Sequence, residues 1–195
     1  MMNRKNLIVI IAISAIIGLL LTACDNGTGG SNGGGNNNGS IYAMGDTGPG
    51  GGKVFYDKGS VSNGWRYLEA SLVNQGTSLA WASFGYDRTD IIGTGTTVGT
   101  GKANTAVILA VDINAPAAKA CKDYNGGGKN DWFLPSKDEL IELFKQKSHF
   151  GITTGNFWSS SQYNARNAWN QYFDDGYQNY DFKNYTIDVR AIRAF

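Results

Sequence analysis

The chain has 195 residues, and its 17 Lys and Arg against 16 Asp and Glu give a formal net charge of +1. This length allows one ordinary domain and a small additional segment, and the near-neutral charge excludes the basic footprint that nucleic acid or an anionic membrane surface requires. Two cysteines and one histidine provide no cluster of zinc ligands. We therefore predict no nucleic-acid partner, no metal and no cofactor.

Residues 1–23 have the pattern of a lipoprotein signal peptide. The basic start MMNRK precedes an apolar run at 7–21 that is too short and wrongly flanked for a membrane-spanning helix. The motif LTAC at 21–24 resembles the lipobox of bacterial lipoproteins. We predict cleavage before Cys24 and attachment of lipid, including palmitate, to Cys24; an uncleaved anchor helix is the alternative. Both place the protein in the cell envelope, and we expect a lipid-anchored membrane lipoprotein at the outer surface.

Residues 24–40 link this anchor to the rest of the chain. Positions 25–40 hold seven Gly and five Asn with no aliphatic or aromatic side chain, so nothing there offsets the entropy of ordering. We predict a flexible tether with a root-mean-square span of roughly 20–24 Å. Cys121 would be the one thiol left after lipidation, and we expect it to be a small buried apolar group.

The folded domain is expected at 41–195, and it begins with strands. KVFYD at 53–57 and WRYLEAS at 65–71 are predicted strands around turn residues. Residues 74–101 are rich in Gly, Thr and Ser and are predicted to be loop. Strands near the two ends of the domain could pair with each other and bring its termini together.

Helices are predicted in the middle of the domain. Residues 103–113 have helical spacing, and Pro116 can begin a second helix. The clearest helix is expected at 136–148, where Ser136 and Glu139 form a capping box.

Short strands complete the pattern: WFLP at 132–135, and FWSSS, AWNQYF and VRAIRAF in the stretch 157–195. Two main helices, short antiparallel strands and much loop predict an α+β domain.

Two glycine-rich motifs lack the spacing of a phosphate-binding loop. They are GDTGPGGGK at 45–53 and GTGTTVGTGK at 93–102, whose glycines we expect in tight turns and close packing. His149 is expected in the last turn of the 136–148 helix, where a cation suits the helix dipole, rather than in a catalytic triad. Without a convincing catalytic group, we predict that the protein is not an enzyme.

The segment YFDDGYQNYDFKNY at 172–185 is dense in Tyr, Asn and Asp and contains no Leu, Val or Ile. In a strand AWNQYF, Trp169 and Phe173 share one face, the predicted core side, while Asn170 and Tyr172 face solvent. Tyr offers a large rigid contact area and Asn adaptable hydrogen bonds, so an exposed patch of this composition is a candidate binding surface. The alternative is a Tyr-rich region packed on its own neighbours.

Codon chemistry suggests a further hypothesis for the same segment. Codons for Asn, Tyr and Asp share a middle adenine and can differ in the first base alone. Random replacement of adenines in Asn codons would leave such a mixture between fixed words such as FWSSS and VRAIRAF.

Five motifs support a family resemblance: GDTGPGGGKVFYD, GTGKANTAVILA, DWFLPSKDEL, FWSSSQYN and VRAIRAF. Together they resemble bacterial, notably spirochaete, lipoproteins with a domain related to the C-terminal domain of Legionella collagen-like protein. The similarity is strongest to the Treponema variable protein A type, whose C-terminal segment is diversified by a retroelement. It implies a C-type-lectin fold of the formylglycine-generating-enzyme subtype over about 41–195, with a variable region at 158–195.

The resemblance implies ligand binding through variable residues on a fixed scaffold. Carried onto this sequence, the candidates are Tyr163, Asn164, Arg166, Asn167, Asn170, Tyr172, Asp174, Asp175, Tyr177, Asn179, Tyr180, Asp181, Phe182, Asn184, Tyr185, Ile187 and Asp188. Formylglycine-generating enzymes work with a cysteine pair and calcium-dependent lectins with further motifs, and the domain has neither. We therefore predict neither oxidase chemistry nor a calcium site.

These observations predict a surface-displayed lipoprotein that binds an unknown protein or glycan, acting as a monomer. The alternative is a cell-envelope lipoprotein of structural or enzymatic role that uses the same fold without diversification.

Overall fold

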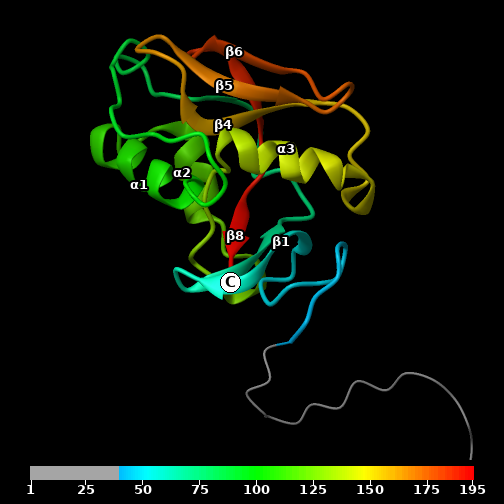
Figure 1. Ribbon diagram of the computed structural model, residues 1–195. Helices are drawn as coiled ribbons and strands as arrows, with labels where there is room; N and C mark the ends of the chain where they lie inside the picture. The colour runs from blue at the N-terminus through cyan, green and yellow to red at the C-terminus, as the bar shows by residue number, and fades with distance from the viewer. Residues whose placement is uncertain (1–39) are drawn as a thin grey trace, which may run out of the picture. The chain divides into compact units, whose positions relative to one another are not determined.

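The computed structural model describes residues 40–195 (Figure 1). The predicted signal peptide, the predicted lipidation site Cys24 and all of the predicted linker before Ser40 lie outside the described residues. Within residues 40–195, no helix combines the length and the apolar character needed to cross a membrane.

The domain is of the predicted α+β type, with three α-helices and two sheets. The elements in chain order are β1 (Lys53–Ser62), β2 (Trp65–Ala70), β3 (Gly76–Ala80), α1 (Gly101–Val111), α2 (Pro116–Asp123), α3 (Lys137–Lys145), β4 (Asn156–Gln162), β5 (Asn167–Tyr172), β6 (Gln178–Phe182), β7 (Thr186–Val189) and β8 (Ile192–Ala194). One sheet has the strand order β3-β7-β4-β5-β6 and the other β1-β2-β8. The helix predicted to begin at Pro116 is confirmed as α2, with Pro116 in its first turn, so the described domain has three helices where two main ones were expected.

The strands differ from the prediction in two places. β3 lies within 74–101, which was predicted to be loop; it pairs with β7, so a long-range partner rather than local composition makes it a strand. WFLP forms only a single bridge, between Phe133 and Ile192, instead of a strand. The predicted strands at 53–57 and 65–71 are confirmed as parts of β1 and β2.

The capping box of α3 is confirmed. The Glu139 N–H donates to Ser136 Oγ at 3.3 Å, and the Ser136 N–H donates to Glu139 Oε2 at 2.6 Å. The helix ends at Lys145 rather than 148, and a 3-10 turn at Lys147–Phe150 follows it. His149 therefore lies in that turn and not in the last turn of the α-helix, which corrects its predicted place.

The core consists of two apolar clusters that meet at β4. Phe157 belongs to a cluster with Phe55, while the next residue, Trp158, belongs to one with Trp81. Adjacent residues of a strand point to opposite faces, so β4 is covered on both sides. Cys121 is fully buried, as predicted, and burial raises the pKa of its thiol.

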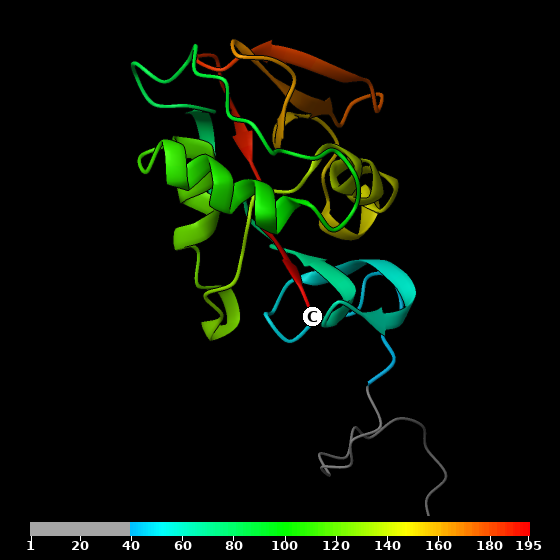
Figure 2. The ribbon, with the colours of Figure 1, turned by 60° about the vertical axis from the view of Figure 1, so that its left-hand side comes forward.

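The two ends of the described domain meet at the three-stranded sheet. β2 pairs antiparallel with β8, which confirms the predicted pairing of terminal strands. The rings of Tyr42 and Phe195 lie 5.2 Å apart, edge to face. Figures 1 and 2 show this sheet at one end of the domain and the β5–β6 hairpin at the other.

The first glycine-rich loop, at 45–52, folds around the fully buried carboxylate of Glu69. The N–H groups of Gly50 and Gly52 donate to its oxygens at 2.9 and 3.1 Å, and Arg193 Nη1 lies 2.9 Å from Oε1. A methyl group on Gly50 would lie 2.7 Å from that same oxygen. The glycines allow this close approach, which agrees with the predicted packing role.

The second glycine-rich loop, at 93–101, folds around Glu139, which is also fully buried. The Gly99 N–H donates to Glu139 Oε1 at 2.8 Å. Burial raises the pKa of Glu139 to about 6, although N–H groups from Ser136, Gly99 and Gly101 favour its charged form. No arginine or lysine pairs with this carboxylate among the described residues.

Candidate ligand-binding surface

Fifteen of the seventeen candidates lie on the β5–β6 hairpin and the turns on either side of it, at the outer edge of the five-stranded sheet, and Ile187 and Asp188 lie on β7 (Figure 1). Ten of the seventeen candidates are exposed: Tyr163, Asn164, Arg166, Asp174, Asp175, Tyr177, Tyr180, Phe182, Asn184 and Tyr185. Five are half-buried: Asn167, Tyr172, Asn179, Asp181 and Asp188. Most of the candidate set is thus accessible to a ligand.

Two candidates, Ile187 and Asn170, are buried, so the prediction that they contact a ligand is wrong. Ile187 belongs to the core cluster around Trp81, because it stands on the inner side of β7. Asn170 is 1% exposed, and its Nδ2 donates to Asp181 Oδ2 at 2.8 Å. Neither side chain can reach a ligand without rearrangement of the sheet.

The predicted facing of β5 is wrong for Trp169 and Asn170. Ala168 is the residue that packs into the core, with no exposed surface, so its neighbour Trp169 stands on the outer face. Phe173 is buried as predicted, because the alternation breaks where both Asn170 and Gln171 turn inward. The small size of Ala168 fits the space beside the buried tryptophans, which a hydropathy pattern does not reveal.

Trp169 is the base of an exposed aromatic cluster. The rings of Tyr163 and Tyr180 stack at 3.9 Å with an interplanar angle of 8°. Trp169 meets Tyr163 edge to face at 5.1 Å and Tyr180 at 5.6 Å. Lys137 Nζ lies 3.9 Å from the Trp169 ring centroid, on the side of α3. The arrangement holds two tyrosine rings rigidly at the surface.

A second aromatic pair lies beyond β6, where Phe182 and Tyr185 meet edge to face at 5.4 Å. They line a pocket of about 260 Å³ with Arg166, Asn184, Asp87 and Arg88.

Asp87 and Arg88 come from a loop that was not predicted to lie at this site. The same loop carries the exposed side chains of Phe84 and Tyr86, the first of them without any burial. The signal in the sequence that could have marked this loop was Phe84, an aromatic residue within the polar stretch SFGYDRTD at 83–90.

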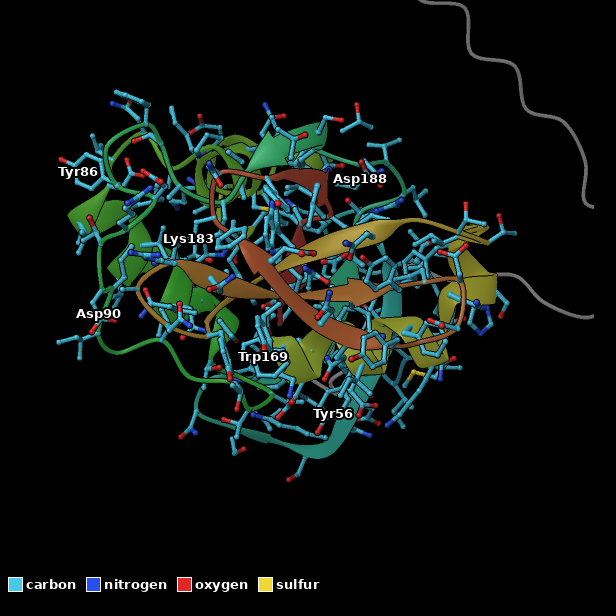
Figure 3. The ribbon with its side chains drawn as sticks, turned by 90° about the horizontal axis from the view of Figure 1, so that it is seen from above. Tyr56, Tyr86, Asp90, Trp169, Lys183 and Asp188 are labelled. Carbon is cyan, nitrogen blue, oxygen red and sulfur yellow. The ribbon has the colours of Figure 1, made fainter. Side chains whose placement is uncertain are left out.

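One buried lysine fixes this loop to the hairpin. Lys183 Nζ donates to the Thr89 carbonyl at 2.7 Å and to Gln162 Oε1 at 2.6 Å. Burial lowers the pKa of Lys183 to about 8, against the opposing effect of Asp90 and Asp87. Figure 3 shows Lys183 on the side of the hairpin that faces the loop with Tyr86 and Asp90.

A larger cavity lies elsewhere. It has about 720 Å³ and is lined by the β1–β2 hairpin, with Tyr56 and Trp65, and by the beginning of α1, with Lys102. None of the seventeen candidate residues lines this cavity. Residues 40–195 bring no three His, Cys, Asp or Glu side chains together in a group that could hold a metal ion.

Comparison with known protein families shows to which family the chain belongs. A family model described as the Lcl C-terminal domain matches residues 71–193, well over half of the sequence. The chain belongs to this family. The Lcl C-terminal domain begins after β2 and ends within β8, so it includes the whole candidate surface, while β1 and β2 precede it.

A solved structure shares part of the fold. The Lcl C-terminal domain chain is similar to a fimbrial protein from Bacteroides ovatus ATCC 8483, with 15% identity and a TM-score of 0.50. The match covers 68% of this chain and 36% of the fimbrial protein, so the chain spans about a third of that protein's length. At this identity the likeness concerns the fold alone. Comparison with curated proteins gave no match.

Proposed function

We propose that this protein is a surface-displayed lipoprotein that binds a protein or glycan ligand through the surface formed by the β5–β6 hairpin. The observation that carries the proposal is the concentration of exposed aromatic rings there: Tyr163, Tyr177, Tyr180, Phe182 and Tyr185. Monomeric domains seldom expose so many rings together unless they meet a partner.

The frame beneath these rings supports a binding role. β4 holds Trp158 fully buried, and its Nε1 donates to the Leu79 carbonyl at 2.8 Å. Trp81 Nε1 donates to the Ser159 carbonyl at 2.7 Å. Rings that are held by a rigid frame lose little entropy on binding, which favours affinity.

The finer points of fold and origin belong to the same proposal. We place the domain in the C-type-lectin fold of the formylglycine-generating-enzyme subtype and relate it to the Treponema variable protein A type. In this proposal a retroelement diversifies the segment 158–195, the protein has no enzymatic activity, and Cys24 carries the lipid anchor.

Binding is tested by removing the rings. Replacement of the five exposed aromatic residues by Ala should abolish binding to ligands found on arrays of glycans and of folded proteins. The matched control replaces Val61, Val111 and Ile113 by Ala, since these side chains are equally solvent-accessible but lie outside the hairpin. Undiminished binding by the aromatic variant would refute the site.

Diversification is tested on the genes. Across isolates, substitutions should be concentrated at the ten exposed candidates and absent from the buried Trp158 and Lys183. A reverse-transcriptase gene and an adenine-rich near-copy of the last codons should lie close by. If neither is found and substitutions are scattered evenly, the alternative of a non-diversified envelope lipoprotein gains support.

A further inference from the structure

β6 is an edge strand of the five-stranded sheet and pairs only with β5 (Figure 1). The opposite edge strand, β3, packs against α2. β6 touches a helix at its first residue, where Gln178 Nε2 donates to the Lys137 carbonyl of α3 at 2.8 Å.

The hydrogen-bond pattern shows which backbone groups of β6 remain free. The Tyr172 N–H donates to the Tyr177 carbonyl at 2.9 Å, and the Lys183 N–H donates to the Arg166 carbonyl at 2.9 Å. Because bonding in an antiparallel pair alternates along each strand, the odd-numbered residues between these two points face β5. The N–H groups of Gln178, Tyr180 and Phe182 then point outward.

Few of these outward groups have another partner. The Phe182 carbonyl accepts the Tyr185 N–H at 2.8 Å, and among residues 40–195 no hydrogen bond outside the ladder uses the N–H groups of Gln178, Tyr180 or Phe182. The carbonyls of Gln178 and Tyr180 complete a row of donors and acceptors with the two-residue spacing of a strand.

β6 also lacks the devices that normally protect an edge. Proteins block exposed edges with Lys, Pro or a bulge, whereas β6 reads QNYDF and stays in register with β5 throughout. Its one charge, Asp181, is half-buried and bonded to Asn170, so it does not stand across the edge.

We propose that β6 takes up an extended segment of a partner protein as a sixth strand of the sheet. The inference rests on the proposed function and narrows it to one ligand class, a polypeptide strand. A row of backbone N–H and C=O groups is complementary to another backbone, whereas a glycan has no matching repeat of amides.

The side chains around the edge define the sequence that would fit. Tyr180 and Phe182 project to one face, and Asn179 and Asp181 to the other. The added strand should therefore alternate apolar residues, which contact the rings, with polar or basic residues, which meet the amide and the carboxylate. It would run along β6 beside Tyr180 of the Tyr163–Tyr180 stack and Phe182 of the neighbouring pocket.

Two substitutions at one position separate backbone pairing from side-chain contact. Tyr180→Ala removes the ring but keeps the outward N–H, whereas Tyr180→Pro removes both and leaves the ladder to β5 intact. The probes are linear peptides selected from a phage-displayed random library on the full chain in detergent micelles. The Pro variant should bind these peptides about tenfold more weakly than the Ala variant. Hydrogen exchange should show protection of the Gln178, Tyr180 and Phe182 amides on binding.

Each outcome decides the inference. Weaker binding by the Pro variant, with protected edge amides, supports strand addition. Equal binding by the two variants with unprotected amides overturns it while leaving side-chain binding by the hairpin intact. Selection of no linear peptide overturns it as well, and the arrays of glycans and folded proteins then test the proposed function separately. If the chain self-associates as its concentration rises and Tyr180→Pro abolishes this, the edge binds a second copy of the chain. That result also overturns the inference.

Discussion

The glycine-rich loops and the β5–β6 hairpin are both rich in polar groups, but the loops direct theirs toward the protein interior and the hairpin directs many of its own toward solvent. In the loops, backbone N–H groups converge on the buried carboxylates of Glu69 and Glu139. In the hairpin and its flanking turns, tyrosine side chains face solvent, and among residues 40–195 no hydrogen bond outside the ladder uses the outward N–H groups of β6. Polar groups that are satisfied internally stabilise the domain, and those left at the surface are available to a ligand. Substitutions in the two regions should therefore separate stability from binding.

We expect the largest loss of stability from Gly101→Ala in the second loop. The added methyl would lie 2.9 Å from both the Leu134 carbonyl oxygen and the Ser136 nitrogen. Because these backbone atoms cannot move aside easily, the free energy of unfolding in urea should fall by about 3 kcal/mol. Gly59→Ala is the control: its methyl meets nothing within 4 Å, and only the positive φ opposes it, by about 1–2 kcal/mol. Equal losses would contradict the packing argument.

Glu139→Gln should have the next largest effect, and that effect should depend on pH. The pKa of Glu139 rises from 4.5 in the unfolded chain to about 6 in the fold, so between these values the folded state holds the extra proton. The stability from this proton is fully present below pH 4.5 and lost as the pH rises through 6, by about 2 kcal/mol.

Gln cannot titrate, so the advantage of the wild type over the variant should shrink by that amount between pH 4 and pH 7. Urea denaturation across this range measures it. Glu142→Gln is the control, because that carboxylate pairs with Lys145 on the helix surface. A difference that stays constant with pH would exclude proton uptake by Glu139.

Lys183→Met tests the contact between the hairpin and the loop at 83–92. It removes the donor to the Thr89 carbonyl and to Gln162, which should lower the free energy of unfolding by about 1–2 kcal/mol. The loop at 83–92 should lose protection in hydrogen exchange before the rest of the domain does. Lys119→Met, which removes only an exposed pair with Asp123, should leave the loop unchanged.

Tyr177→Ala should have the smallest effect on stability. The ring is 62% exposed, so the free energy of unfolding should change by less than about 0.5 kcal/mol. Ligand binding should nevertheless weaken. A melting temperature well below that of the wild type would show that the hairpin ring is structural.

Sequence patterns predicted correctly those elements that depend on residues close together in the chain. The capping box of Ser136 and Glu139 determines where α3 begins, and these two residues are only three positions apart in the chain. The glycines of the two loops also signalled close packing. That they surround Glu69 and Glu139 could not be predicted, because the carboxylates are supplied by distant strands and helices.

The candidate surface was predictable in composition but not in orientation. The density of Tyr and Asn after 162 indicated an exposed patch, yet Trp169 stands outside and Asn170 inside. Ala168, not Trp169, packs into the core cluster, whose other members, such as Trp81, lie far away in the chain. For the same reason nothing local connected Lys183 with the Thr89 loop.

The segment 186–194 has a mechanical consequence. It runs from β7, inside the larger sheet, directly into β8, in the smaller sheet. Tension between the Tyr42 end of the domain and a load held on β6 would therefore pass along covalent backbone as well as hydrogen bonds. The two halves could separate only after β7 or β8 had been stripped from its sheet.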